Sequence, residues 1–155
     1  MTKSVLFISA NPIRNPNQLV DVLNNLSSKS WELQLWSFYE VPESIKKELV
    51  TIIGPENPWQ PKAKTSNGHL LAKFTHLGMR AVRAAWRKLY NRTRRDRAWW
   101  ALKNDKVVAG IQPTVLVAID SFAVFPTWKL AKRKKDAMAL SNLTSLHSFT
   151  ASIND

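Results

Sequence analysis

The sequence SVLFISANPIRNPN, residues 4–17, decides which fold the chain can adopt. Residues 4–9 are an apolar run of β-branched, aliphatic and aromatic side chains with no polar alternation, which is typical of a strand covered on both faces. Prolines and asparagines fill the positions that follow and predict a turn-rich loop directly after the strand. A second apolar run, TVLVAI at residues 114–119, ends at Asp120 and predicts another buried strand.

Segments with helical spacing lie between and after these strands. Apolar residues recur at helical spacing in residues 17–28, where Asn15 or Asn17 can cap the helix, and in residues 43–53 and 126–140. Residues 31–38 read as a further strand. Apolar strands that alternate with amphipathic helices predict the α/β class, with a mainly parallel open sheet and right-handed crossovers.

The length of 155 residues predicts one domain. We expect a single α/β domain over residues 1–140, which includes a basic amphipathic helical segment at residues 69–103, and a C-terminal tail at 141–155, part of which packs on the domain. The absence of cysteine excludes disulfides, thiol nucleophiles and cysteine-ligated metals. The three histidines show no ligand spacing, so no metal site is expected.

Phosphate-binding motifs are absent from the sequence. The loop after the first strand contains no glycine, and neither G-x-G-x-x-G nor G-x-x-x-x-G-K-[ST] occurs in the chain. Glycines in these motifs let the backbone approach a phosphate, so NAD binding and P-loop NTPase activity are not expected. No Ser/His/Asp order that would indicate a nucleophilic hydrolase is visible either.

Positive charge is concentrated in one block. The chain carries a net charge of +12, and residues 62–106 hold 13 basic and 2 acidic residues. Tryptophans beside this block favour an anionic membrane surface as the partner; nucleic acid, an acidic protein and a merely solvated face are the alternatives. The residues expected to contact anions or the membrane are Arg80, Arg83, Arg87, Arg94, Arg95 and Trp99.

Polar side chains follow the first and last predicted strands. Because the carboxyl ends of parallel strands meet at one edge of a sheet, Asn11, Arg14 and Asp120 are expected at one ligand-binding edge. Arg14 either binds an anionic ligand through two N–H groups of its guanidinium or is a solvated loop residue. Asp120 is either a base or acceptor for a ligand hydroxyl or a cap for the helix that follows.

Targeting signals are not evident. Four apolar residues after Lys3 are too few for a signal-peptide core, and Asp120 interrupts the apolar stretch at 107–125. We therefore expect a cytoplasmic protein, peripheral at the inner face of the membrane.

The motif N-P-x-R at residues 11–14, and V-L-V-A-I-D followed by F-P-T-W-K-L-A-K-R at 115–133, resemble the N-terminal domain of GT-B-fold bacterial glycosyltransferases. The resemblance implies a three-layer Rossmann-like open sheet, mainly parallel, with helices on both faces. It also implies that Asn11, Arg14 and Asp120 line the site of a glycan or lipid-linked acceptor.

In that family the C-terminal domain binds the sugar nucleotide through a separate carboxylate motif, and a full enzyme of this kind would be more than twice as long as this chain of 155 residues. The resemblance therefore implies an acceptor half without a cofactor of its own. We expect it to be inactive without a sugar-nucleotide-binding domain or subunit. The alternative is a non-enzymatic basic α/β module that binds nucleic acid or an acidic protein.

Overall fold

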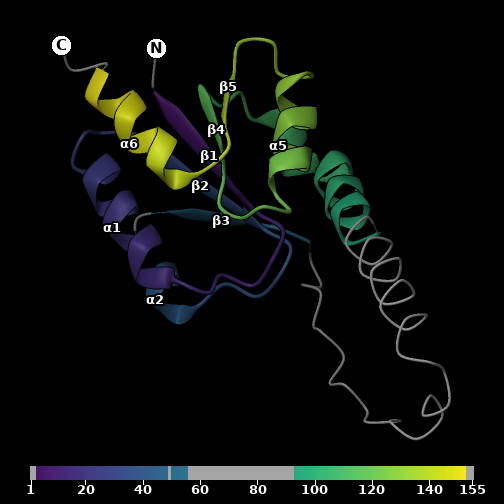
Figure 1. Cartoon of the computed structure of the whole chain (residues 1–155), viewed down its shortest axis with the longest axis horizontal. Helices are drawn as coiled ribbons and strands as arrows, with labels where there is room; N and C mark the ends of the chain where they lie inside the picture. The colour runs from purple at the N-terminus through teal and green to yellow at the C-terminus, as the bar shows by residue number, and fades with distance from the viewer. Residues whose placement is uncertain (1–2, 49, 56–92, 153–155) are drawn as a thin grey trace, which may run out of the picture.

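The computed structural model describes residues 3–48, 50–55 and 93–152 (Figure 1). Within these residues, five strands form one sheet in the order β3-β2-β1-β4-β5, and every neighbouring pair is parallel. The predicted α/β class with a parallel open sheet is therefore confirmed. The strands are β1 (Ser4–Ser9), β2 (Glu32–Ser37), β3 (Thr51–Ile53), β4 (Val115–Ala118) and β5 (Met138–Leu140).

Strand β1 lies in the middle of the sheet, where Val5 pairs with Leu33 of β2 on one side and with Val115 of β4 on the other. Every residue of β1 and β4 is buried. Successive side chains of a strand point to opposite faces, so Phe7 belongs to one core cluster and Ile8 to the other. Because both faces are covered, the strand tolerates no polar alternation.

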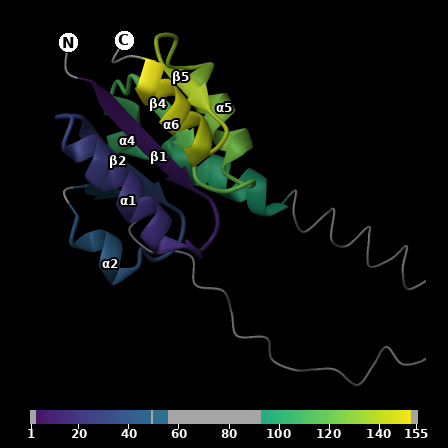
Figure 2. The same ribbon diagram turned by 60° about the vertical axis from the view of Figure 1, so that its left-hand side comes forward.

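Helices cover both faces of the sheet (Figures 1 and 2). Side chains of α1 (Pro16–Ser27), α2 (Glu43–Lys46) and α6 (Leu143–Ser152) join the core cluster of one face. Side chains of the helical residues 93–104, α4 (Lys106–Gly110) and α5 (Val124–Ala131) join the cluster of the other face. This arrangement confirms the expected three layers.

The prediction of one helix over residues 43–53 was wrong. Helix α2 is short, and residues 51–53 form β3, an edge strand in which Ile52 pairs with Leu35 of β2. The β-branched run from Val50 to Ile53 has high strand propensity, and pairing with β2 buries Ile53. Sheet pairing therefore outweighs the helical spacing of the apolar residues.

The prediction of one helix over residues 126–140 was wrong at both ends. Helix α5 begins at Val124, which places Pro126 in the first turn, where its missing N–H breaks no helical hydrogen bond. The helix ends at Ala131, and residues 138–140 form β5 on the edge of β4. Between them, Lys134 Nζ donates to the carbonyl oxygens of Ala109 and Ile111 at 2.7 and 2.8 Å, which fixes this connection to the end of α4.

Residues 143–152, in the predicted C-terminal tail, form helix α6. Leu143 and Leu146 of α6 are buried in the core cluster that contains the apolar side chains of α1. Of the basic segment 69–103, residues 69–92 lie outside the described part of the chain, and residues 93–103 are helical. None of the helices formed by described residues has both the length and the apolar character needed to cross a membrane.

Candidate functional site

The site lies where the direction of the chain across the sheet reverses. From β1 the chain moves outward through β2 and β3, whereas β4 returns to the other side of β1 and is followed by β5. The loops after β1 and β4 therefore leave the carboxyl edge on opposite faces, and the crevice between them is where open α/β sheets bind ligands.

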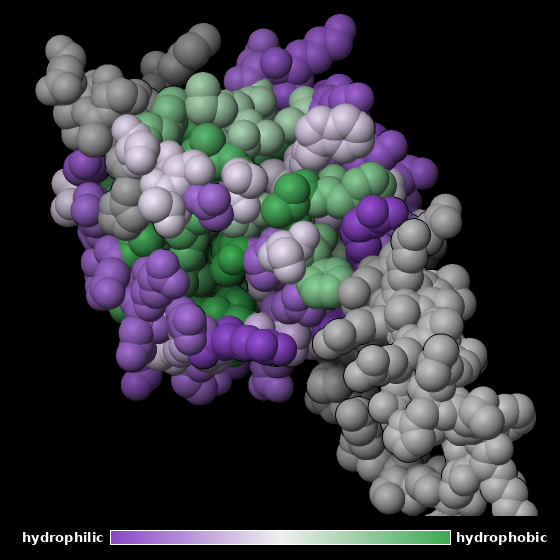
Figure 3. All heavy atoms as spheres, in the orientation of Figure 1, coloured by the Kyte–Doolittle hydropathy of each residue, from purple (hydrophilic) through white to green (hydrophobic). Residues whose placement is uncertain are grey.

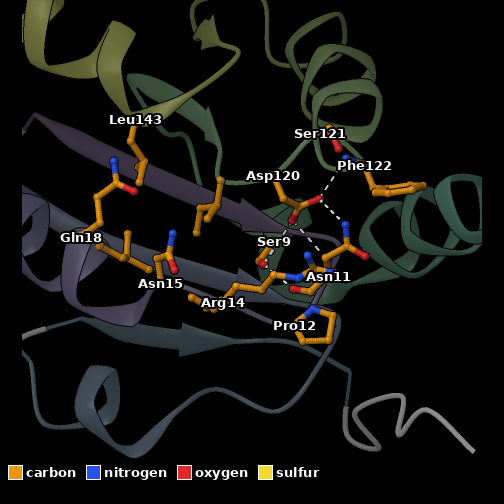
Figure 4. Close-up of a pocket in the computed structure, with 13 residues that line it drawn as sticks. Ser9, Asn11, Pro12, Arg14, Asn15, Gln18, Asp120, Ser121, Phe122 and Leu143 are labelled. Carbon is orange, nitrogen blue, oxygen red and sulfur yellow. Dashed lines mark hydrogen bonds between the residues drawn. The ribbon is translucent and has the colours of Figure 1, made fainter.

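The carboxylate of Asp120 holds the loop after β1 (Figure 4). Its Oδ2 accepts hydrogen bonds from the backbone N–H groups of Ala10 at 2.8 Å and Asn11 at 3.1 Å. The hydroxyl of Ser9 lies 3.3 Å from Oδ2 and 2.8 Å from the carbonyl oxygen of Asn11, so its single proton serves one of these acceptors at a time. Asp120 thus sets the path of the loop.

The other oxygen of Asp120 holds the turn after β4. Oδ1 accepts from the backbone N–H groups of Phe122 at 2.9 Å and Ala123 at 3.1 Å, and from Asn11 Nδ2 at 3.1 Å. Sequence analysis left two roles open, and the geometry favours a cap, although Asp120 caps the turn at 121–123 rather than α5 itself. Because both oxygens already accept hydrogen bonds from the protein, Asp120 is a positioning residue.

A hollow of about 310 Å³ opens beside this carboxylate, between α1 and the loop after β4 (Figure 3). One wall carries the exposed polar side chains Arg14, Asn15 and Gln18. The lining also includes apolar side chains from the loop after β1, α1, the end of β4 and the start of α6: Ile13, Leu19, Ile119 and Leu143. The hollow therefore has a mixed polar and apolar lining, and Gln18 lies beside Leu143 (Figure 4).

Arg14 is exposed on the wall of this hollow, and within the described part of the chain no group accepts a hydrogen bond from its guanidinium. Asn15 is the N-cap residue of α1, yet its side chain makes no capping hydrogen bond. Both side chains can therefore turn their N–H groups toward a ligand, and an arginine stays charged at any physiological pH.

The three residues predicted for the ligand edge, Asn11, Arg14 and Asp120, all line this one hollow. Sequence reasoning missed Gln18 and Leu143. Gln18 stands in the first turn of the helix after the loop, and that position could have identified it. Leu143 could not have been found, because no local signal shows that the start of α6 returns to the carboxyl edge.

Arg94, predicted to contact anions, is half-buried between two loops. Its Nε donates to the hydroxyl of Tyr39 at 3.1 Å, and its Nη2 donates to the same oxygen. The guanidinium carbon lies 5.5 Å from the centre of the Tyr39 ring and 5.7 Å from that of Phe122. Arg94 therefore joins the loops after β2 and β4, and its contact with an anion stays a prediction.

Two further residues predicted to contact anions, Arg95 and Trp99, contact α5 and the turn after it, respectively. The Arg95 guanidinium lies 4.1 Å from the centre of the Phe125 ring, and that of Arg133 lies 5.0 Å from the Trp99 ring. The remaining predicted positions, Arg80, Arg83 and Arg87, lie outside the described residues.

The side chains gathered at the hollow do not by themselves identify a chemical reaction. Among them, no three or more His, Asp or Glu side chains are grouped so that they could hold a metal ion. No family model, curated protein or solved structure matches the chain.

Proposed function

We propose that the chain is the acceptor-binding domain of a glycosyltransferase, and that the hollow beside Asp120 receives the acceptor. The observation that supports this most directly is the position of the hollow, at the carboxyl edge between β1 and β4 with the exposed guanidinium of Arg14 on its wall. The resemblance of residues 11–14 and 115–133 to GT-B N-terminal domains points to the same edge.

The mixed lining of the hollow suits a ligand that carries both oxygens and apolar surface. Arg14, Asn15 and Gln18 offer N–H donors to hydroxyl or phosphate oxygens. Leu19 and Leu143 offer apolar contact to the same ligand. A sugar ring has both kinds of surface, and so does the head of a lipid-linked glycan.

In this proposal the chain binds and orients the acceptor only. Sugar transfer requires a sugar nucleotide, which we expect to be bound by a separate domain or subunit. Asp120 contributes by keeping the loop after β1 in shape. A charged donor such as Arg14 strengthens the hold on the acceptor, because hydrogen bonds from charged groups contribute more than neutral ones.

NMR titration of the ¹⁵N-labelled chain tests this proposal. The probes are methyl β-D-glucoside and n-octyl β-D-glucoside below its micelle concentration. The amides of Asn11, Arg14, Gln18 and Phe122 should shift in a saturable way. Arg14→Ala should weaken binding about tenfold, since a hydrogen bond from a charged donor is lost.

The matched control is Lys29→Ala, because Lys29 is exposed and follows α1, at the amino-terminal edge of the sheet. It should leave the titration unchanged. The proposal fails if neither glucoside shifts these amides, or if UDP-glucose binds at them more tightly than either glucoside, because that would make the hollow a donor site.

A further inference from the structure

Helix α5 presents apolar and basic side chains on its outer side. Pro126, Thr127 and Leu130 are buried against the sheet, whereas Val124 is 38% exposed and Trp128 is 46% exposed. Phe125, Trp128, Lys129 and Lys132 follow the i, i+3, i+4, i+7 spacing of one helix face. Exposed or half-buried aromatic and aliphatic side chains thus lie beside lysines on α5 and its C-cap residue.

Cations and rings are interleaved across this strip. The Nζ atom of Lys132 lies 4.0 Å from the centre of the Trp128 ring, and that of Lys129 lies 5.6 Å from the ring centres of both Trp128 and Phe125. Arg95 over Phe125 extends the same pattern onto the helical residues 93–104. The pairs therefore connect two helices into one surface.

We propose that this surface docks the protein on an anionic lipid bilayer. We call it the cationic-aromatic face, and it consists of Arg95, Trp99, Val124, Phe125, Trp128, Lys129, Lys132 and Arg133. Aromatic and aliphatic side chains enter the boundary between headgroups and acyl chains, while long basic side chains reach the lipid phosphates. Residues 129–135 hold five basic residues and no acidic one, and three of the five belong to this face, so an anionic surface is the complementary partner.

The arrangement of the rings favours lipid over nucleic acid. Single-stranded nucleic acid binds by stacking bases on free ring faces. Here cations of the chain itself already lie over the rings of Trp99, Phe125 and Trp128. A lipid interface needs no free ring face, because it takes up the exposed edge of the ring and leaves the cations near the phosphates.

The cationic-aromatic face borders the hollow beside Asp120. Phe122 lines the hollow and lies two residues before α5, and the Arg94 guanidinium contacts its ring from the helical residues 93–104. Docking through this face would therefore bring the rim of the hollow close to the headgroups, where a lipid-linked acceptor would meet it. This last step rests on the proposed function, whereas docking itself does not.

Co-sedimentation with vesicles tests the docking. The full chain should partition onto mixed phosphatidylglycerol–phosphatidylcholine vesicles and not onto pure phosphatidylcholine vesicles, and added salt should weaken binding. The double variant Lys132→Gln/Arg133→Gln should bind about 25-fold more weakly, at about fivefold for each charge removed. Trp128→Ala should also weaken binding, and circular dichroism should confirm that both variants are folded.

Matched controls separate the face from net charge and from exposed tryptophan in general. Lys29→Gln/Lys47→Gln removes two charges elsewhere, and Trp100→Ala removes a tryptophan that is 68% exposed and lies outside the face. Both should bind vesicles within about twofold of the unaltered chain. The proposal is overturned if Lys29→Gln/Lys47→Gln loses as much vesicle affinity as Lys132→Gln/Arg133→Gln, or if the chain binds neutral and anionic vesicles equally. It is also overturned if the chain binds a single-stranded oligonucleotide more tightly than vesicles and the variants of the face abolish that binding. The glucoside titration is independent of all three outcomes.

Discussion

The carboxylate of Asp120 joins two segments that are 110 residues apart in the sequence. Replacement by asparagine keeps the shape but leaves one acceptor oxygen, so whichever way the amide turns, N–H groups on one side of the crevice lose their acceptor. We expect Asp120→Asn to lower the free energy of unfolding by about 2–4 kcal/mol, measured by urea denaturation. The exposed Asp21 of α1 is the control, and Asp21→Asn should change stability by less than about 0.5 kcal/mol. Equal stability of the two variants would contradict the structural role of Asp120.

The location of the site could be predicted at the residue scale, but its hydrogen bonds could not. Asn11, Arg14 and Asp120 meet because they follow neighbouring parallel strands, and strand type was readable from the apolar runs. The role of Asp120 depends on which N–H groups the two loops turn toward it. The backbone geometry of a loop has no periodic signal in the sequence. Only the structure therefore distinguishes the two roles considered for Asp120, acceptor for a ligand hydroxyl and cap of the following turn.

At the scale of elements, the end of β3 approaches the end of β2 so closely that a side chain does not fit. A Cβ atom on Gly54 would lie 2.6 Å from the backbone carbonyl oxygen of Ser37, which cannot move away as a flexible side chain could. We expect Gly54→Ala to reduce stability by about 1–3 kcal/mol in a thermal or urea titration. Gly110→Ala is the control, since nothing lies within 4 Å of its Cβ position, and it should be neutral or stabilising. A neutral Gly54→Ala would show that β3 can shift away from β2.

The two short edge strands are the elements that the sequence did not reveal. Ile45 and Ile52 are spaced as on a helix, and only pairing with β2 shows that Ile52 belongs to a strand. Strand β5 is three residues long, and its Met138 and Ala139 are exposed and not β-branched. Strands this short gain their stability from the neighbour they pair with, which a local sequence window does not contain. The buried strands β1 and β4 could be predicted because burial on both faces requires an uninterrupted run of apolar residues.

For the whole molecule, the excess of positive charge predicts how stability responds to salt. The chain carries 23 basic and 11 acidic residues, and two ion pairs within its described part, Lys46–Glu43 and Arg95–Asp96, both have exposed side chains. Exposed pairs contribute little to stability, so salt has little attraction to weaken and much repulsion to screen.

We therefore expect the midpoint of thermal unfolding to rise by a few degrees between low and physiological ionic strength. Scanning calorimetry in sodium chloride measures the shift. Sodium phosphate at matched ionic strength is the comparison, because its multivalent anion should raise the midpoint further if basic side chains are clustered closely enough to share it. A midpoint that falls with sodium chloride would mean that attractive charge pairs outweigh the repulsion. The basic side chains would then lie too far apart to repel one another strongly, which would argue against a dense cationic patch that attracts an anionic partner.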